Sequence, residues 1–196
     1  MEQEKAPRVK LSPDLNKIVE AILFVLKLGA DRGKTVTQYD VVKTLFLADR
    51  RHLNDYGRPI TFDNYVAMFH GPVPSQTYDL LKGGRAAEAA IRGSLPWTSD
   101  PIPGQNARSF VATMDPDLDQ LAPSEVEAIA ESFTVVKSLG FDQVRRLTHE
   151  DVAYLEAWEG GPNGNGSYPM SLGLLFDKPN WEIASELEFV SKFGMH

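Results

Sequence analysis

The sequence predicts an α+β fold that is mainly α-helical, namely a compact helical domain with a small antiparallel β-sheet or hairpin. Apolar residues recur at the spacing of an amphipathic helix over several long stretches. Capping residues and glycine or proline stops bound most of these stretches. Short runs of β-prone residues lie beside turn-forming residues near positions 65–74 and 95–113. The length of 196 residues suits one domain over residues 1–196, since domains commonly hold about 100–200 residues.

The first predicted helix follows a polar segment, residues 1–11, which we expect to be loose. Ser12-Pro13 resembles an N-cap followed by proline at the first helical position. The stretch from Ala21 to Leu26 is apolar on every side, so this helix should lie at the centre of the core. It should stop near Gly29 or Gly33.

The second predicted helix opens at Thr37, where Asp40 completes a pattern like a capping box. It ends at Gly57-Arg58-Pro59, because glycine suits the position after a helix and proline cannot continue one. Tyr65 to Phe69 then favours a strand, and 70–74 (HGPVP) favours a rigid turn. Ser75 opens a short helix that Gly83-Gly84 closes.

The remaining elements are predicted from shorter patterns. Residues 85–93 favour a short helical piece, and 95–99 with 108–113 favour a hairpin. Ser124 and Glu127 form a capping box for a helix that ends at Gly140, and Thr148 with Asp151 caps another that ends near Trp158. The glycine-rich residues 160–166 predict a flexible loop, and 177–196 a helical tail.

Composition excludes several classes of site. The chain has no cysteine, so disulfides and thiolate metal sites are impossible. The net charge of −7 and the absence of a basic stripe argue against nucleic acid as a partner. Ala21 to Leu26 is far shorter than the roughly 20 apolar residues that cross a bilayer, and no signal sequence is evident. We therefore expect a cytoplasmic protein with no membrane partner.

Asp49 is the most informative single residue, because it lies on the apolar stripe of the second helix, four residues from both Leu45 and Leu53. Burial of an unpaired carboxylate is costly, so Asp49 must find donors. We favour a structural role, in which it binds backbone N–H groups of the turn at 70–74 or pairs with an arginine. The alternative is a general acid or base.

No other residue pattern predicts chemistry. The four histidines (His52, His70, His149 and His196) form no HExxH motif and no spaced pair on one helix, so we expect neither a metal site nor a cofactor. Ser75 lacks the GxSxG context of a nucleophile. We therefore assign no catalytic residues.

Several linked motifs resemble one known family, the Panacea domain, also called the SocA-like antitoxin domain, which is phage-associated. The resemblance covers about residues 15–160. The motifs that carry it are Thr44–Arg50, Tyr56–Thr61, Tyr65–Met68, His70–Ser75, Leu121–Glu127, and Leu147–Glu150 followed by Trp158.

The resemblance implies an antitoxin of a bacterial or phage toxin–antitoxin system, which neutralises a protein toxin by direct protein–protein interaction. Neutralisation could mask the toxin or present it to a cellular protease. The rigid aromatic turn within Tyr65–Leu81 suits a fold corner and equally a docking element, because a preorganised segment loses little entropy when it binds. An acidic chain would attract a basic toxin.

Two groups of residues are candidates for partner binding or for a structural corner. The predicted corner consists of Asp49, Arg50, His70, Gly71, Pro72, Pro74, Thr148 and His149. The expected contact points beside it are His52, Arg51 and Gln76, together with the tail residues Trp181 and Phe193. An exposed Trp181/Phe193 face would also support a homodimer.

Two other functions stay open. A small hydrolase could use Asp49 with His52 or His70. A transcriptional regulator is the third hypothesis, although no helix-turn-helix or basic helix is evident.

Overall fold

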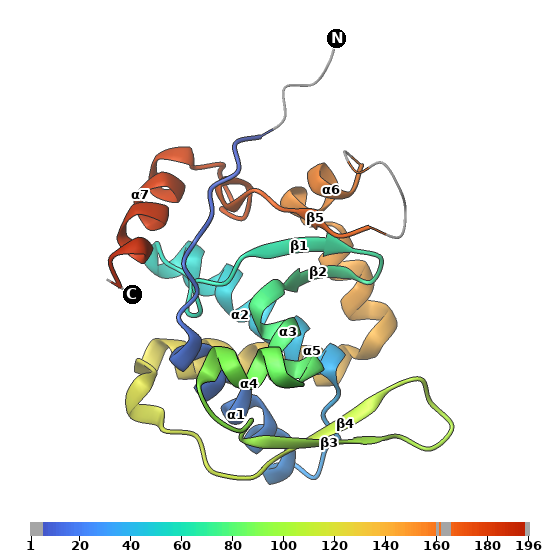
Figure 1. Ribbon diagram of the computed structural model, residues 1–196. Helices are drawn as coiled ribbons and strands as arrows, with labels where there is room; N and C mark the ends of the chain where they lie inside the picture. Colours follow the sequence, from blue (N-terminus) through green and yellow to red (C-terminus); the bar gives the residue numbers. More distant parts are fainter. Residues whose placement is uncertain (1–5, 160, 162–165, 195–196) are drawn as a thin grey trace.

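The computed structural model describes residues 6–159, 161 and 166–194, and confirms the predicted fold class. The described residues form seven α-helices and two small antiparallel sheets. The β3–β4 hairpin and α1 lie at one end of the molecule, and the other sheet lies with α6 and α7 at the opposite end (Figure 1). None of the described helices is both long enough and apolar enough to cross a membrane.

The first two helices carry most of the core. Helix α1 (Leu15–Asp31) is buried on every side from Ala21 to Leu26, as its sequence predicts. Asp14, rather than the expected Ser12, caps it, because the Asp14 carboxylate accepts from the Lys17 N–H at 3.1 Å. Helix α2 (Gln38–Tyr56) starts with the predicted capping box of Thr37 and ends at Gly57, which adopts φ 76°.

Helix α2 separates two clusters of buried apolar side chains. Val42 and Leu45 face the larger cluster with α1, α5 and the β3–β4 hairpin. Phe46 and Leu53 face the other cluster, together with β1, α6 and the C-terminal segment. The helix is thus apolar on two sides, and the polar residues Lys43, Asp49 and His52 are buried within it.

The sheet nearest α6 has the order β2–β1–β5, with all pairs antiparallel. Strands β1 (Tyr65–Met68) and β2 (Gly71–Pro74) pair from Tyr65–Pro74 to Met68–Gly71, so the tight turn lies at Phe69-His70. The interpretation of 70–74 as a turn was therefore wrong beyond its first residue. Strand β5 (Tyr168–Pro169) completes the sheet.

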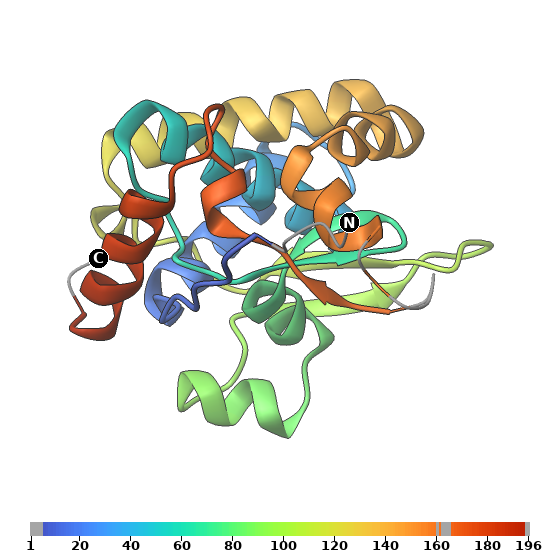
Figure 2. The ribbon, with the colours of Figure 1, turned by 90° about the horizontal axis from the view of Figure 1, so that it is seen from above.

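The middle of the chain follows the prediction. Helices α3 (Ser75–Lys82) and α4 (Arg85–Ile91) project together on one side, as Figure 2 shows. Strands β3 (Trp97–Pro101) and β4 (Arg108–Ala112) form the predicted hairpin. A short 3₁₀ helix, η1 (Leu118–Gln120), leads into α5.

Helix α5 (Pro123–His149) is longer than expected. Gly140, the predicted end of the helix, has φ 71° and ψ 178°, and the helix resumes after this kink. Helix α6 (Val152–Glu159) is capped by Asp151 alone, whose carboxylate accepts from the N–H groups of Ala153 and Tyr154. The predicted cap Thr148 instead lies inside α5.

The C-terminal segment comprises a 3₁₀ helix, η2 (Leu172–Leu174), and the predicted helix α7 (Trp181–Lys192). Residues 6–11, which we expected to be loose, run along this segment: the Ser171 hydroxyl donates to the Pro7 carbonyl at 2.6 Å, and Leu11 is buried. Residues 1–5, His196 and most of the predicted loop 160–166 lie outside the described residues.

Candidate protein-binding surface

Asp49 is a buried structural carboxylate. One oxygen accepts from the N–H groups of Ile60 (2.8 Å) and Thr61 (3.0 Å), and the other from the hydroxyls of Thr61 and Tyr65 (2.6 Å for Tyr65). Burial raises the pKa of Asp49 to about 6, although these four bonds act to lower it. Asp49 therefore fastens α2 to the segment that enters β1.

The expected partners of Asp49 were wrong in detail, because its donors come from residues 60–65 and not from the turn at 70–74. His52 is also buried, at 1% exposure, instead of facing solvent. Its Nδ1 donates to the Arg58 carbonyl at 2.8 Å, and its Nε2 lies 3.1 Å from the Ser124 hydroxyl. Neither ring nitrogen is thus directed to Asp49.

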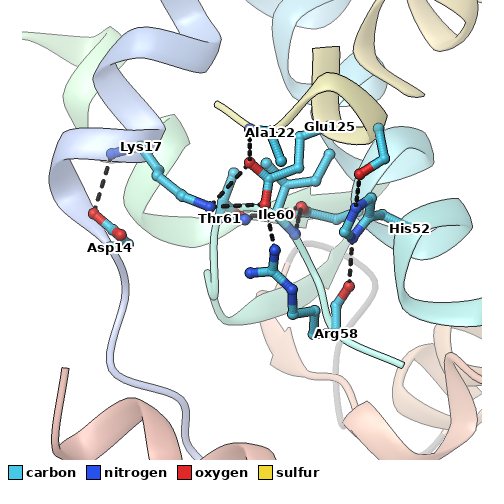
Figure 3. A network of polar contacts seen from close by, with 10 residues as sticks. Asp14, Lys17, His52, Arg58, Ile60, Thr61, Ala122 and Glu125 are labelled. Carbon is cyan, nitrogen blue, oxygen red and sulfur yellow. Dashed lines mark hydrogen bonds and ion pairs between the residues drawn. The ribbon is translucent and has the colours of Figure 1, made fainter. Parts of the chain in front are cut away.

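A second buried carboxylate, Glu125, joins α5 to α1 and to the segment that follows α2 (Figure 3). Its oxygens lie 2.7 and 2.9 Å from Lys17 Nζ, and one lies 3.2 Å from the Arg58 guanidinium. The same carboxylate accepts from the Ala122 N–H at 2.8 Å. Because Glu125 serves the first turn of α5 and Ser124 faces His52, the predicted Ser124–Glu127 capping box does not form.

Asp63 fastens the start of α3 in a similar way. Its carboxylate accepts from the N–H groups of Gln76 (2.9 Å) and Thr77 (2.8 Å), which explains why α3 has no cap of its own at Pro74. Burial raises the pKa of Asp63. Gln76 is half-buried here, and it contributes its backbone to this bond.

Arg50 connects α2 to the start of α6 and to the segment that precedes α7. Its guanidinium lies 2.7 Å from Asp151, the cap of α6, and 3.1 Å from Asp177. The neighbouring Arg51 is exposed and pairs with Asp55 and Glu131. Most of the motif residues therefore hold elements together.

The second half of the predicted corner forms behind the β1–β2 turn. A Cβ on Gly71, which has φ 99°, would lie 2.7 Å from Lys43 Nζ, 2.8 Å from Thr148 Oγ1 and 3.2 Å from His149 Cδ2. The structure thus brings Gly71, Thr148 and His149 together, with Pro72 and Pro74 buried in β2. It adds Lys43, which the sequence analysis missed, and places Asp49 elsewhere.

Lys43 is buried at 1% exposure, and its ammonium donates to the Pro72 carbonyl at 2.8 Å. Burial lowers its pKa to about 7. The run from Val41 to Asp49 is apolar except at three positions, so Lys43 had the same signal as Asp49: a charge within a helix that is buried on two sides.

Six residues form a continuous surface around the β1–β2 turn, which we name the turn surface. Its members are Tyr39, Phe69, His70, Phe141, Arg145 and Trp158. Phe69 and Phe141 are 51% and 45% exposed. Four segments contribute: the start of α2, the turn, the part of α5 beyond Gly140, and α6.

Ring contacts connect the turn surface. Phe141 lies 4.5 Å from Tyr39 and 5.4 Å from His70, between ring centroids. Phe69 lies 4.9 Å from His70, and the Arg145 guanidinium lies 5.0 Å from the Phe69 centroid. Trp158 extends the surface at 6.5 Å from Phe69. Aromatic residues and arginine are the side chains that most often dominate protein interfaces.

The tail offers a second exposed apolar face. Phe189 and Phe193 lie 4.9 Å apart and are mostly exposed, whereas Trp181 covers Gly173 of η2 and is only 37% exposed. Of the two predicted tail contacts, Phe193 is thus freely accessible and Trp181 is partly used in packing.

Residues 41–159 match the model of one family, described as "Antitoxin SocA-like, Panacea domain". The chain belongs to this family. The match covers more than half of the chain, from the first turn of α2 to the end of α6, and includes every member of the turn surface except Tyr39. The comparisons with curated proteins and with solved structures found no match.

Proposed function

We propose that this Panacea-domain protein is the antitoxin of a toxin–antitoxin pair, and that it neutralises a protein toxin by binding it at the turn surface. The observation that carries the proposal is the exposure of Phe69 and Phe141 beside Arg145, within the region that matches the antitoxin family. Apolar rings of this size gain most when a partner removes them from water.

The turn surface also has a rigid base. Phe69 and His70 sit on a hairpin whose second strand is held by Lys43 through the Pro72 carbonyl. Two prolines in β2 restrict its backbone further. A surface that is ordered before binding loses little entropy on binding, which favours affinity.

Co-expression with the neighbouring open reading frame tests this function. The neighbour is induced alone, with the wild-type chain, and with a Phe69→Ala/Phe141→Ala chain. We expect the neighbour to stop growth, the wild type to restore it, and the double variant to fail at equal protein level. A harmless neighbour, or rescue by both chains, would contradict the proposal.

The same experiment separates masking from delivery to a protease. We propose masking, in which the chain bound through the turn surface covers the active site of the toxin. The toxin level should then remain constant during rescue, and rescue should persist in hosts that lack individual ATP-dependent proteases. Disappearance of the toxin during rescue would instead indicate delivery to a protease.

A further inference from the structure

The turn surface and the residues directly behind it contain several positively charged or imidazole groups that have no carboxylate partner among the described residues. They come from three places: Lys43 on α2, His70 in the turn, and Arg145 with His149 on α5. We name these four residues the basic cluster. Such a cluster is unexpected in a chain with a net charge of −7.

The basic cluster contains hydrogen-bonding atoms without partners. Arg145 Nε and His149 Nε2 are both buried, and neither has a hydrogen-bond partner among the described residues. Buried donors and acceptors are almost always satisfied in folded proteins, because an unsatisfied one costs about 1–3 kcal/mol. The two residues that carry these atoms lie one helical turn apart on α5, and both have hydrogen-bonding capacity that the described residues leave unused.

The charges around His149 are all of one sign. Burial, Arg145, Lys43 and His70 each lower the pKa of His149, in that order of size. Burial, Arg145 and Lys43 lower the pKa of His70 in the same way. The ring of Tyr154 also lies against His149, at 4.5 Å between centroids.

Two carboxylates near Tyr39 are directed away from the basic cluster. Asp40 pairs with Lys137 at 3.2 Å and accepts from Thr37. Asp142 is exposed, and its effect is on Tyr39, whose pKa is raised by burial first and then by Asp40 and Asp142. No described carboxylate shifts the pKa of Lys43, His70 or His149. The cluster thus holds basic groups that the described residues do not neutralise.

We propose that the basic cluster is a receptor for one carboxylate, supplied by a side chain of the protein that docks on the turn surface. That a docked protein supplies the carboxylate rests on the function proposed above. The ability of the basic cluster to bind a carboxylate is a property of the free chain. A carboxylate is planar and compact, and it accepts from an arginine and a second donor at once. Aromatic rings beside it would exclude water and strengthen the bond.

Acetate is a probe for this receptor in the full-length free chain. The side-chain resonances of His149 and His70 are followed by NMR against pH, in chloride and in acetate at equal ionic strength. A bound carboxylate favours the imidazolium, so acetate should raise the apparent pKa of His149 by about one unit. The His149→Gln variant lacks one imidazole resonance, and the missing resonance is thereby assigned to His149.

Two variants make the result specific. Arg145→Gln removes the main donor, so the acetate-dependent shift of His149 should disappear. Arg146→Gln removes the exposed neighbouring charge and should leave the shift intact. Dispersed spectra confirm that both variants are folded. A shift that survives Arg145→Gln, or an absence of any shift in the wild type, would overturn the proposal.

The same titration in inorganic phosphate distinguishes a receptor for a carboxylate from a receptor for a phosphate. If inorganic phosphate moves His149 and acetate does not, the receptor is for phosphate and the carboxylate proposal is wrong. Failure of the growth rescue would not change the acetate result, since no toxin is present in the NMR experiment. Equally, failure of the acetate experiment would leave the rescue result standing.

Discussion

At the scale of single residues, the charged groups inside this protein act in two ways. Asp49, Asp63 and Glu125 are buried, and each is surrounded by donors from a neighbouring segment. Lys43 is equally buried but has one acceptor, the Pro72 carbonyl. The carboxylates therefore hold the fold together, whereas the basic groups leave bonding capacity unused near the surface.

Asp49→Asn should lower the free energy of unfolding by about 1–3 kcal/mol, because a single amide oxygen replaces two carboxylate oxygens that accept from four donors. Urea denaturation measures the change. Asp55→Asn, on the exposed side of the same helix, is the matched control and should change stability by less than about 0.5 kcal/mol. Equal effects of both substitutions would show that Asp49 is not structural.

Because burial lowers the pKa of Lys43, we expect the stability of the protein to depend on pH. The pKa of Lys43 is about 7 in the folded chain and 10.5 in the unfolded chain, so above pH 7 the unfolded state binds more protons. Stability should therefore rise with pH between about 7 and 10, by up to about 1.4 kcal/mol per pH unit. Relative to Lys43→Met, the wild type should gain stability over this range in chloride buffer. Parallel curves for both proteins would contradict the assignment.

At the scale of elements, the β1–β2 hairpin determines the turn surface, and Gly71 determines how the hairpin packs. The position has left-handed backbone and lies against Lys43 and Thr148. Helix α5 reaches the same place because it resumes after Gly140. A kink and a glycine contact thus bring α2, α5 and the turn together.

Gly71→Ala should destabilise the protein more than Gly104→Ala. Both glycines have positive φ, which costs an alanine about 1–2 kcal/mol. Gly104 has open space around its Cβ position, whereas Gly71 has two atoms within 2.8 Å, which should add about 1–3 kcal/mol of overpacking. Thermal denaturation compares the two. Equal losses would mean that the contact behind the turn is loose.

Local sequence patterns predicted the elements better than their contacts. Thr37 with Asp40 and Gly57 were sufficient to place α2, because caps act within four residues. The Ser124–Glu127 box failed because Ser124 faces His52, a residue far away in the sequence. Likewise, nothing local indicates that Phe69, Phe141 and Trp158 meet, since the turn surface depends on the tertiary fold.

At the scale of the whole molecule, the family motifs and the exposed surface have different roles. Residues such as Asp49, Arg50 and Gly71 are used for internal contacts and leave little for a partner to touch. The exposed rings of Phe69 and Phe141 belong to the turn surface, and those of Phe189 and Phe193 lie at the C-terminal end of α7. These two exposed aromatic faces can therefore be altered independently by mutation.

The most direct test of this account is the affinity of the purified chain for its toxin, measured by calorimetry for two matched pairs of variants. Phe69→Ala and Phe141→Ala should each weaken binding at least about tenfold, which corresponds to about 1.4 kcal/mol. Phe189→Ala and Phe193→Ala should each change it by less than about threefold, or about 0.7 kcal/mol. Tight binding by the first pair together with loss of binding by the second would place the toxin on the tail and contradict the account.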